Sequence, residues 1–200
     1  MVNTIIKPHE RTAIRLAWAT IAWNVIEAVV AIAAGIAAGS IALVGFGLDS
    51  SVEVMSAAVI VWQFRGLAAT RERLALRLIA ISFFALGSYV AVRAAIDLAS
   101  RAEPDSSAVG IAVAALSLIV MPFLARMKRR TGEAMGSATV LADSNQTQLC
   151  AYLSAILLGG LILNATVGWW WADPVAAIAI AALAINEGRQ AWRGETCEAC

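Results

Sequence analysis

The stretch GFGLDSSVEVMSAAVIVW, residues 45–62, places two carboxylates, Asp49 and Glu53, in a segment that is otherwise apolar enough for a membrane. At a helical spacing of i, i+4 both side chains lie on one face, about 6 Å apart along the axis. Two anions close together in hydrocarbon are costly unless a cation lies between them. The stretch therefore predicts a membrane helix with a cation-binding face.

The composition of the whole chain is typical of a polytopic membrane protein. Of its 200 residues, 60% are hydrophobic and 14% are charged, and the mean hydropathy is +0.77. A net charge of +1 gives a nucleic-acid partner no electrostatic support. With one histidine, three cysteines and no Ser/His/Asp set, the sequence indicates neither an enzyme nor a disulfide framework, and we expect no prosthetic group.

Six apolar segments are each long enough to cross a bilayer, which takes roughly 20 helical residues. They cover about residues 12–38, 41–64, 74–98, 108–124, 137–167 and 171–186. We therefore predict an all-α fold, a polytopic bundle of six transmembrane helices within residues 12–190. Residues 1–11 are expected to form an N-terminal segment and residues 191–200 a tail with a CxxC motif, without a C-terminal soluble domain.

The basic residues predict how the bundle is oriented. Of fifteen Lys and Arg residues, only Arg93 and Arg101 fall on one side of the predicted topology. The others include a basic loop that is expected after the fourth span, with Arg126, Lys128, Arg129 and Arg130. An even number of spans then puts both termini on the basic, cytoplasmic side, in an inner or plasma membrane of bacterial type.

The fifth apolar segment supplies partners for the two acids. It begins with ADSNQTQLC, residues 142–150, in which Gln146 and Cys150 are again i, i+4. Because spans two and five run in opposite directions, we expect Asp49 level with Cys150, and Glu53 level with Gln146. Two carboxylates, an amide and a thiol could bind one metal ion, and a thiolate favours zinc, cobalt, nickel or cadmium over magnesium or calcium.

Each of these residues also has a purely structural interpretation. Asp49 and Glu53 could pair with basic or hydroxyl side chains and lock the bundle, although no Lys or Arg is expected at mid-depth. Cys150 could be a small buried hydrophobe. Asp143 shares the face of Gln146 and Cys150, and it could be a metal ligand or a helix cap or first-turn charge.

Three further polar sites are candidate accessories. Glu27 on the first span could accept protons or assist metal binding, with Asn24 as a polar neighbour, or a protonated Glu27 could only donate an interhelical hydrogen bond. Cys197 and Cys200 form a single CxxC, whereas a structural zinc site needs four ligands. This tail could capture metal at the cytoplasmic mouth or be dispensable.

Two parts of the sequence resemble the cation diffusion facilitator superfamily. GSIAL at residues 39–43, leading into Asp49-Ser50-x-x-Glu53, is similar to that family's second transmembrane helix. The segment 142–150, followed by GWWWADP at residues 168–174, is similar to its fifth helix and the approach to its sixth. The likeness covers nearly the whole chain, and residues 49–64 most resemble short members without a C-terminal domain, which include a vertebrate vesicular zinc transporter.

This resemblance implies export of divalent metal from the cytoplasm, usually in exchange for protons, by a homodimer in the lipid bilayer. The family site has two acids on helix two, which correspond to Asp49 and Glu53. It also has a His and an Asp on helix five, where this chain has Gln146 and Cys150. The leading hypothesis is a Zn²⁺ transporter. The alternative is a non-transporting membrane protein or metal sensor, which the missing His and Asp favour.

Overall fold

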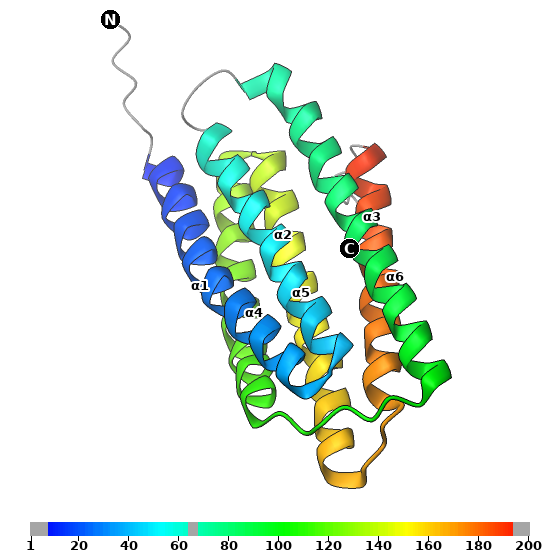
Figure 1. Ribbon diagram of the computed structural model, residues 1–200. Coiled ribbons are helices and arrows are strands. Elements are labelled where there is room, and N and C mark those ends of the chain that lie inside the picture. The colour runs from blue at the N-terminus through cyan, green and yellow to red at the C-terminus, as the bar shows by residue number, and fades with distance from the viewer. Residues whose placement is uncertain (1–7, 64–67, 194–200) are drawn as a thin grey trace, which may run out of the picture.

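The computed structural model describes residues 8–63 and 68–193, and in these ranges it contains six helices and no strand (Figure 1). The helices are α1 (Pro8–Ala38), α2 (Ile41–Gln63), α3 (Ala68–Ser100), α4 (Ala108–Met135), α5 (Ala138–Val167) and α6 (Ala172–Arg193). Consecutive helices run antiparallel, so the start of α1 and the end of α6 lie at the same end of the bundle. The predicted all-α bundle is confirmed.

Five of these helices are long and apolar enough to cross a membrane. Within the described residues the candidate spans are His9–Ala38, Ile41–Val59, Ala80–Ser100, Ala108–Met135 and Asp143–Val167. The sixth helix, α6, is less apolar, and it packs along α3. Large apolar side chains such as Ile36 and Ile119, each 71% exposed, face outward, as expected for a surface in contact with lipid.

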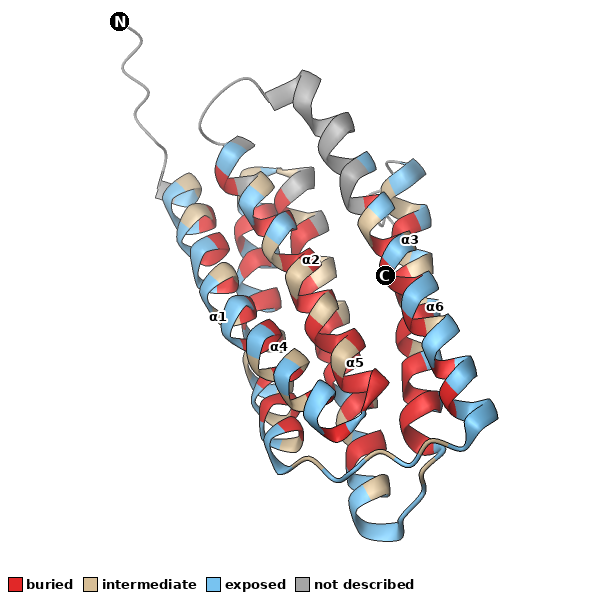
Figure 2. Ribbon diagram, viewed as in Figure 1, coloured by how far each residue is buried: buried red, intermediate tan, exposed pale blue. Residues whose placement is uncertain are grey.

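The helix that carries Asp49 and Glu53 is central in the bundle. The closest pairs are α1 with α2, α4 with α5, and α3 with α6, and α2 also contacts α3, α5 and α6. In Figure 1, α3 and α6 lie side by side at one flank of the group formed by α1, α2, α4 and α5. Buried residues line the surfaces between the helices (Figure 2). Side chains on α2 therefore point into an interior built by several helices.

A glycine lets α1 and α2 approach closely. A Cβ atom on Gly47 would lie 2.7 Å from Cγ1 of Ile32 and 3.1 Å from the carbonyl oxygen of Ala28. Only a residue without a side chain fits so near another helix backbone, as is typical of small-residue contacts in membrane bundles. This contact brings the polar residues of α1 next to those of α2.

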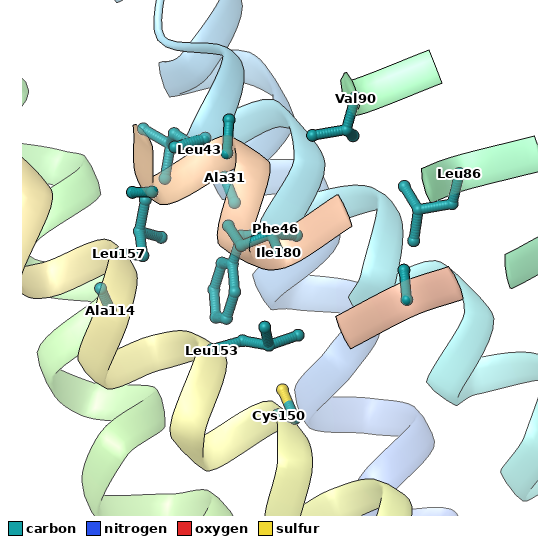
Figure 3. Close-up of a cluster of buried hydrophobic side chains, with 14 of the residues drawn as sticks. Ala31, Leu43, Phe46, Leu86, Val90, Ala114, Cys150, Leu153, Leu157 and Ile180 are labelled. Carbon is teal, nitrogen blue, oxygen red and sulfur yellow. The ribbon is translucent and has the colours of Figure 1, made fainter. Parts of the chain in front are cut away.

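An apolar core fills the interior on one side of the polar residues. Its side chains include Phe46, Leu153 and Leu157, which lie together in Figure 3. Cys150 belongs to the same core cluster and is 1% exposed. The thiol therefore lies where the apolar core meets the polar interior.

The start of α2 is capped by a residue from the start of α6. Ser40 Oγ donates a hydrogen bond to Asp173, and it accepts one from the Leu43 amide at 3.1 Å. Asp173 Oδ2 also accepts from the Ala42 amide at 3.2 Å. A carboxylate at a helix N-terminus satisfies free amides and complements the helix dipole. This link joins GSIAL of residues 39–43 to the ADP of residues 172–174, two parts of the family resemblance that lie far apart in the sequence.

Helix α4 continues well beyond the fourth span expected from the sequence. It begins after the N-cap Ser107, passes through the basic segment and ends at Gly136, which has a left-handed backbone. The interpretation of Lys128 as a loop residue is therefore wrong. The buried face of α4 extends through Lys128 to Thr131 and Gly132 because the helical repeat continues past the apolar segment.

Candidate functional site

Buried polar side chains from α1, α2, α4 and α5 gather inside the bundle. They include Asn24, Glu27, Asp49, Ser50, Glu53, Ser117, Lys128, Asp143 and Thr147, with the thiol Cys150 beside them. Their hydrogen bonds divide most of them into two clusters, one around Lys128 and the other around Glu27. Buried polar groups in a membrane bundle are rare and mark candidate functional sites.

The Lys128 cluster joins α4, α5 and α2, and its members are Lys128, Asp143, Thr147 and Glu53. Lys128 Nζ lies 2.7 Å from Asp143 Oδ2, and it donates to Thr147 Oγ1 at 2.8 Å. Thr147 donates in turn to Glu53 Oε1 at 2.6 Å, and Lys128 Nζ is 4.0 Å from the same oxygen. The Lys128 and Glu53 side chains are each 1% exposed, so this ion-pair network is almost fully withdrawn from solvent.

The Glu27 cluster joins four helices around one carboxylate, and its members are Glu27, Trp23, Ser50, Ser117 and Cys150. Glu27 Oε2 accepts from Trp23 Nε1 at 2.6 Å and from Ser117 Oγ at 2.5 Å. Glu27 Oε1 accepts from Ser50 Oγ at 2.6 Å and lies 3.8 Å from the Cys150 thiol. Both oxygens accept from uncharged donors, so Glu27 makes interhelical hydrogen bonds as an acceptor, whereas the sequence interpretation had a protonated Glu27 as the donor.

Asp49 belongs to neither cluster. Its side chain is 7% exposed, and within the described parts of the chain it has no hydrogen bond or ion pair. The charged side chains that interact with it are acidic, namely Glu53, Glu27 and Glu187. Asp49 is therefore a buried acid on the central helix with no cationic partner in this arrangement.

Three buried oxygens near these acids have no hydrogen-bond partner. They are Glu53 Oε2, Asp143 Oδ1 and Asn24 Oδ1, which come from α2, α5 and α1. Asn24 uses its Nδ2 to donate to the Thr20 carbonyl at 3.0 Å. Buried polar atoms are nearly always paired, so an unpaired one indicates a bound ion, a water or a functional role. Carboxylate and amide oxygens are also the kind of atom that binds cations.

The facing helix presents a different residue to Glu53 than the sequence predicted. Thr147, not Gln146, contacts Glu53, and Gln146 is half-buried. The expected depth is right to within one residue, but the face is rotated, because Asp143, Thr147 and Cys150 form one buried stripe on α5. Cys150 is buried on the same stripe, and its Sγ lies 3.8 Å from Glu27 Oε1.

The accessory residues predicted from the sequence do not all lie at one site. Asp143 is not a helix cap, because Ser137 caps α5 and Asp143 is buried in the ion pair with Lys128. Asn24 lies one turn before Glu27 and faces the interior, as expected for a neighbour of the site. Cys197 and Cys200 lie outside the described residues. Among the residues that are described, no group of three or more His, Cys, Asp and Glu side chains is arranged to hold a metal ion.

Sequence reasoning missed Lys128, Thr147, Ser50 and Ser117. Thr147 could have been found from the spacing of polar and small residues on the fifth span, where Asp143, Thr147, Cys150 and Ser154 recur at intervals of four, three and four. Ser50 was visible beside Asp49, but only the approach of α1 shows that it serves Glu27.

The fold and its interior define an integral membrane protein, a helical bundle that holds acids, a lysine and hydroxyl groups away from lipid. The family model described as the cation efflux transmembrane domain matches residues 17–193. The chain therefore belongs to the cation efflux family, whose members transport metal cations, and the resemblance inferred from residues 39–53 and 142–174 is confirmed.

Two known proteins illustrate how far the similarity reaches. The chain is 26% identical to Transmembrane protein 163 of Xenopus laevis in an alignment of 196 residues that covers 93% of this chain and 70% of that protein. It is 31% identical to Cation-efflux pump FieF of Shewanella oneidensis over 77 residues, which are 38% of this chain and 26% of that protein. The first similarity extends over almost the entire bundle, and the second over one part of it.

Proposed function

We propose that this protein transports divalent metal cations, Zn²⁺ above all, out of the cytoplasm through a site between α2 and α5. The observation that carries the proposal is the pair of buried acids on α2, Asp49 without a hydrogen bond and Glu53 with an unpartnered Oε2. Such groups in a membrane interior favour a cation as their partner. Membership of the cation efflux family and similarity to a protein named a cation-efflux pump support this direction of transport.

The proposed ligands are Asp49, Glu53 and Cys150, and Gln146 is a weaker fourth candidate. Cys150 is buried on α5 with its Sγ 3.8 Å from Glu27 Oε1, and as a thiolate ligand it would favour zinc, cobalt, nickel or cadmium over magnesium. Gln146 reaches the metal only if α5 rotates, because Thr147 faces Glu53 in the present arrangement. Asn24, Glu27, Asp143 and the tail thiols Cys197 and Cys200 are accessory candidates.

Proton antiport follows from the chemistry of these ligands. A carboxylate and a thiolate bind metal well only without their protons, so metal and protons compete for the same atoms. A transporter that alternates between two sides could thus load protons where it releases metal. We propose that it does so as a homodimer in an inner or plasma membrane, with both termini cytoplasmic.

Transport in proteoliposomes tests the proposal. Vesicles loaded with a zinc-sensitive dye and given a pH gradient should take up Zn²⁺ with the wild-type protein, and Asp49→Ala and Glu53→Ala should abolish this uptake. Asp97→Ala is the matched control, since Asp97 is also a buried acid but pairs with Arg93 at 3.5 Å on α3. Wild-type uptake by both α2 variants would rule out the site.

Metal preference tests the role of the thiol. Cys150→Ser keeps a polar atom of similar size but removes the soft ligand, so cadmium uptake should fall more than zinc uptake. The measurement is metal-by-metal flux under the same pH gradient. Equal loss for both metals would show that the sulfur does not bind the transported ion.

A second function, metal sensing without transport, has one observation in its favour. The described residues contain no preformed metal-binding group, and Glu53 and Asp143 already have a cationic partner in Lys128. The two functions differ in flux. Zinc binding by the purified protein without uptake under any pH gradient would favour a sensor.

A further inference from the structure

Lys128 is an unusual residue for the interior of a membrane bundle. Its side chain is 1% exposed and lies within the candidate span Ala108–Met135, whereas the neighbouring Arg126, Arg129 and Arg130 are exposed. Burying an ammonium group in such a place is costly unless partners compensate it. A lysine that served only to orient the protein in the membrane could lie at the surface like its neighbours.

The contacts of Lys128 resemble those that a bound cation would make. Its ammonium group is 2.7 Å from Asp143 Oδ2, 2.8 Å from Thr147 Oγ1 and 4.0 Å from Glu53 Oε1. One positive charge thus serves two carboxylates, and the second oxygen of each, Asp143 Oδ1 and Glu53 Oε2, stays unpartnered. The single charge of lysine leaves this pair of acids undercompensated, and a divalent ion would compensate it fully.

We infer that Lys128 is an internal competitor of the transported metal: its ammonium group occupies the cation position beside Glu53 and Asp143 when no metal is bound, and the metal must displace it. The inference rests on the proposed function, which supplies the metal and its ligand Glu53. It accounts for the absence of a preformed metal-binding group among the described residues, because the acids on α2 and α5 are held by lysine instead.

Displacement makes two variants change metal affinity in opposite directions. Lys128→Met removes the competing charge at similar side-chain length, so Glu53 is left with a vacancy that only an outside cation fills, and metal should bind more tightly. Asp143→Asn removes the carboxylate closest to Lys128. The ammonium group then has Glu53 as its remaining carboxylate partner and should pair with it more strongly, so metal should bind less tightly.

The test is a zinc titration of the purified full-length protein in detergent against a fluorescent chelator of known affinity. All proteins carry Cys197→Ser and Cys200→Ser, so that the tail thiols bind no zinc. Lys128→Met should lower the Kd at least about tenfold, and Asp143→Asn should raise it by a similar factor. In vesicles, Lys128→Met should also slow turnover, because a metal that is bound more tightly is released more slowly.

Two controls separate competition from general damage. Lys128→Arg keeps the charge and should leave the Kd within about threefold of wild type. Arg129→Met removes a positive charge from the next residue, whose exposed side chain pairs with Glu133 at 3.1 Å. It should change the Kd less than about twofold, because surface ion pairs are weak. If Lys128→Met does not fold, Lys128→Gln takes its place in the titration.

The outcomes distinguish the inference from the proposed function. If the wild type binds and transports zinc but Lys128→Met and Lys128→Gln leave the Kd unchanged or raise it, the inference is overturned and the proposed function stands. If the wild type neither binds nor transports zinc, both are overturned. Tightening by Lys128→Met supports competition, since a purely structural role of Lys128 would weaken binding. Weakening by Asp143→Asn is required by the inference but does not support it alone, because loss of Asp143 as a ligand would weaken binding too.

Discussion

The two buried clusters differ in how completely the carboxyl oxygens of their glutamate are hydrogen-bonded. Glu27 accepts hydrogen bonds on both oxygens from Trp23, Ser50 and Ser117, all of which are uncharged. Glu53 receives one hydroxyl from Thr147 and a distant ammonium from Lys128, both on one oxygen, while the other oxygen has no partner. Both side chains are 1% exposed, so burial does not separate them.

The difference teaches that the pairing of a buried acid is more informative than its burial. A carboxyl with complete partners holds helices together, and additional ligands would have to displace existing bonds. A carboxyl with a free oxygen retains the capacity to bind something else. The comparison favours a structural role for Glu27 over the accessory role, and it supports the proposed metal-binding role of Glu53; the following variants test both.

The largest expected effect is on transport by Glu53→Gln compared with Glu27→Gln. The amide at residue 53 keeps the shape but removes the charge that binds metal, so uptake should fall more than about 100-fold, beyond the range for partners outside the ligand set. Glu27→Gln should reduce uptake by less than tenfold on the same scale. Proteoliposome flux measures both, and equal losses would contradict the division of roles.

The next effect is on the free energy of unfolding, which a change at Glu27 should lower more than a change at Glu53. Glu27→Ala leaves the donors of Trp23, Ser50 and Ser117 without their acceptor, and unpaired buried donors cost about 1–3 kcal/mol each, so we expect a loss of several kcal/mol. Glu53→Ala should cost about 1 kcal/mol, because Lys128 keeps Asp143 and Thr147. Unfolding in mixed detergent micelles provides the free energies. A larger loss for Glu53→Ala would contradict the structural role of Glu27.

A smaller effect is expected at Thr147. Thr147→Val keeps the shape of the side chain but removes the hydroxyl that links Lys128 to Glu53, which should cost about 1–3 kcal/mol of unfolding free energy. Thr147→Ser restores the hydroxyl and should recover most of this loss. The same micelle unfolding assay applies, and indistinguishable Val and Ser variants would show that the hydroxyl does not support the Lys128 cluster.

The smallest effect is expected for Gln146→Ala. Its side chain is half-buried and the α5 residue that bonds to Glu53 is Thr147, so the zinc Kd should rise only about threefold, or ~0.7 kcal/mol. A chelator-competition titration measures this. A loss as large as that of Glu53→Gln would mean that Gln146 rather than Thr147 faces the metal when it is bound.

The sequence was sufficient to predict the bundle and half of the candidate site. Asp49 and Glu53 stand out because carboxylates in an apolar run are rare, and Cys150 follows from a facing antiparallel helix. Thr147 was not predicted because threonine is common in apolar segments and carries no charge. The choice between Thr147 and Gln146 depends on the rotation of α5 about its axis. That rotation is fixed by packing between helices, which no local pattern encodes.

Lys128 was missed for a different reason. Counting basic residues to orient the membrane treats each one as a loop charge, and Lys128 stands in a run with Arg126, Arg129 and Arg130. The spacing from Ser117 through Met121 and Leu124 to Lys128 continues one helical face, and this face is buried. The length of α4, and not the charge of its residues, determines that a lysine enters the interior.

The cap that Asp173 places on α2 anchors one end of that helix. Because Ser40 and Asp173 fix its start to α6, a tilt of α2 turns about Ile41 and displaces each residue in proportion to its distance along the axis. Asp49 lies about 12 Å from that end and Glu53 about 18 Å. A tilt of about 10° therefore moves Asp49 by about 2 Å and Glu53 by about 3 Å. Of the two acids, Glu53 thus changes its distance to α5 more for the same motion.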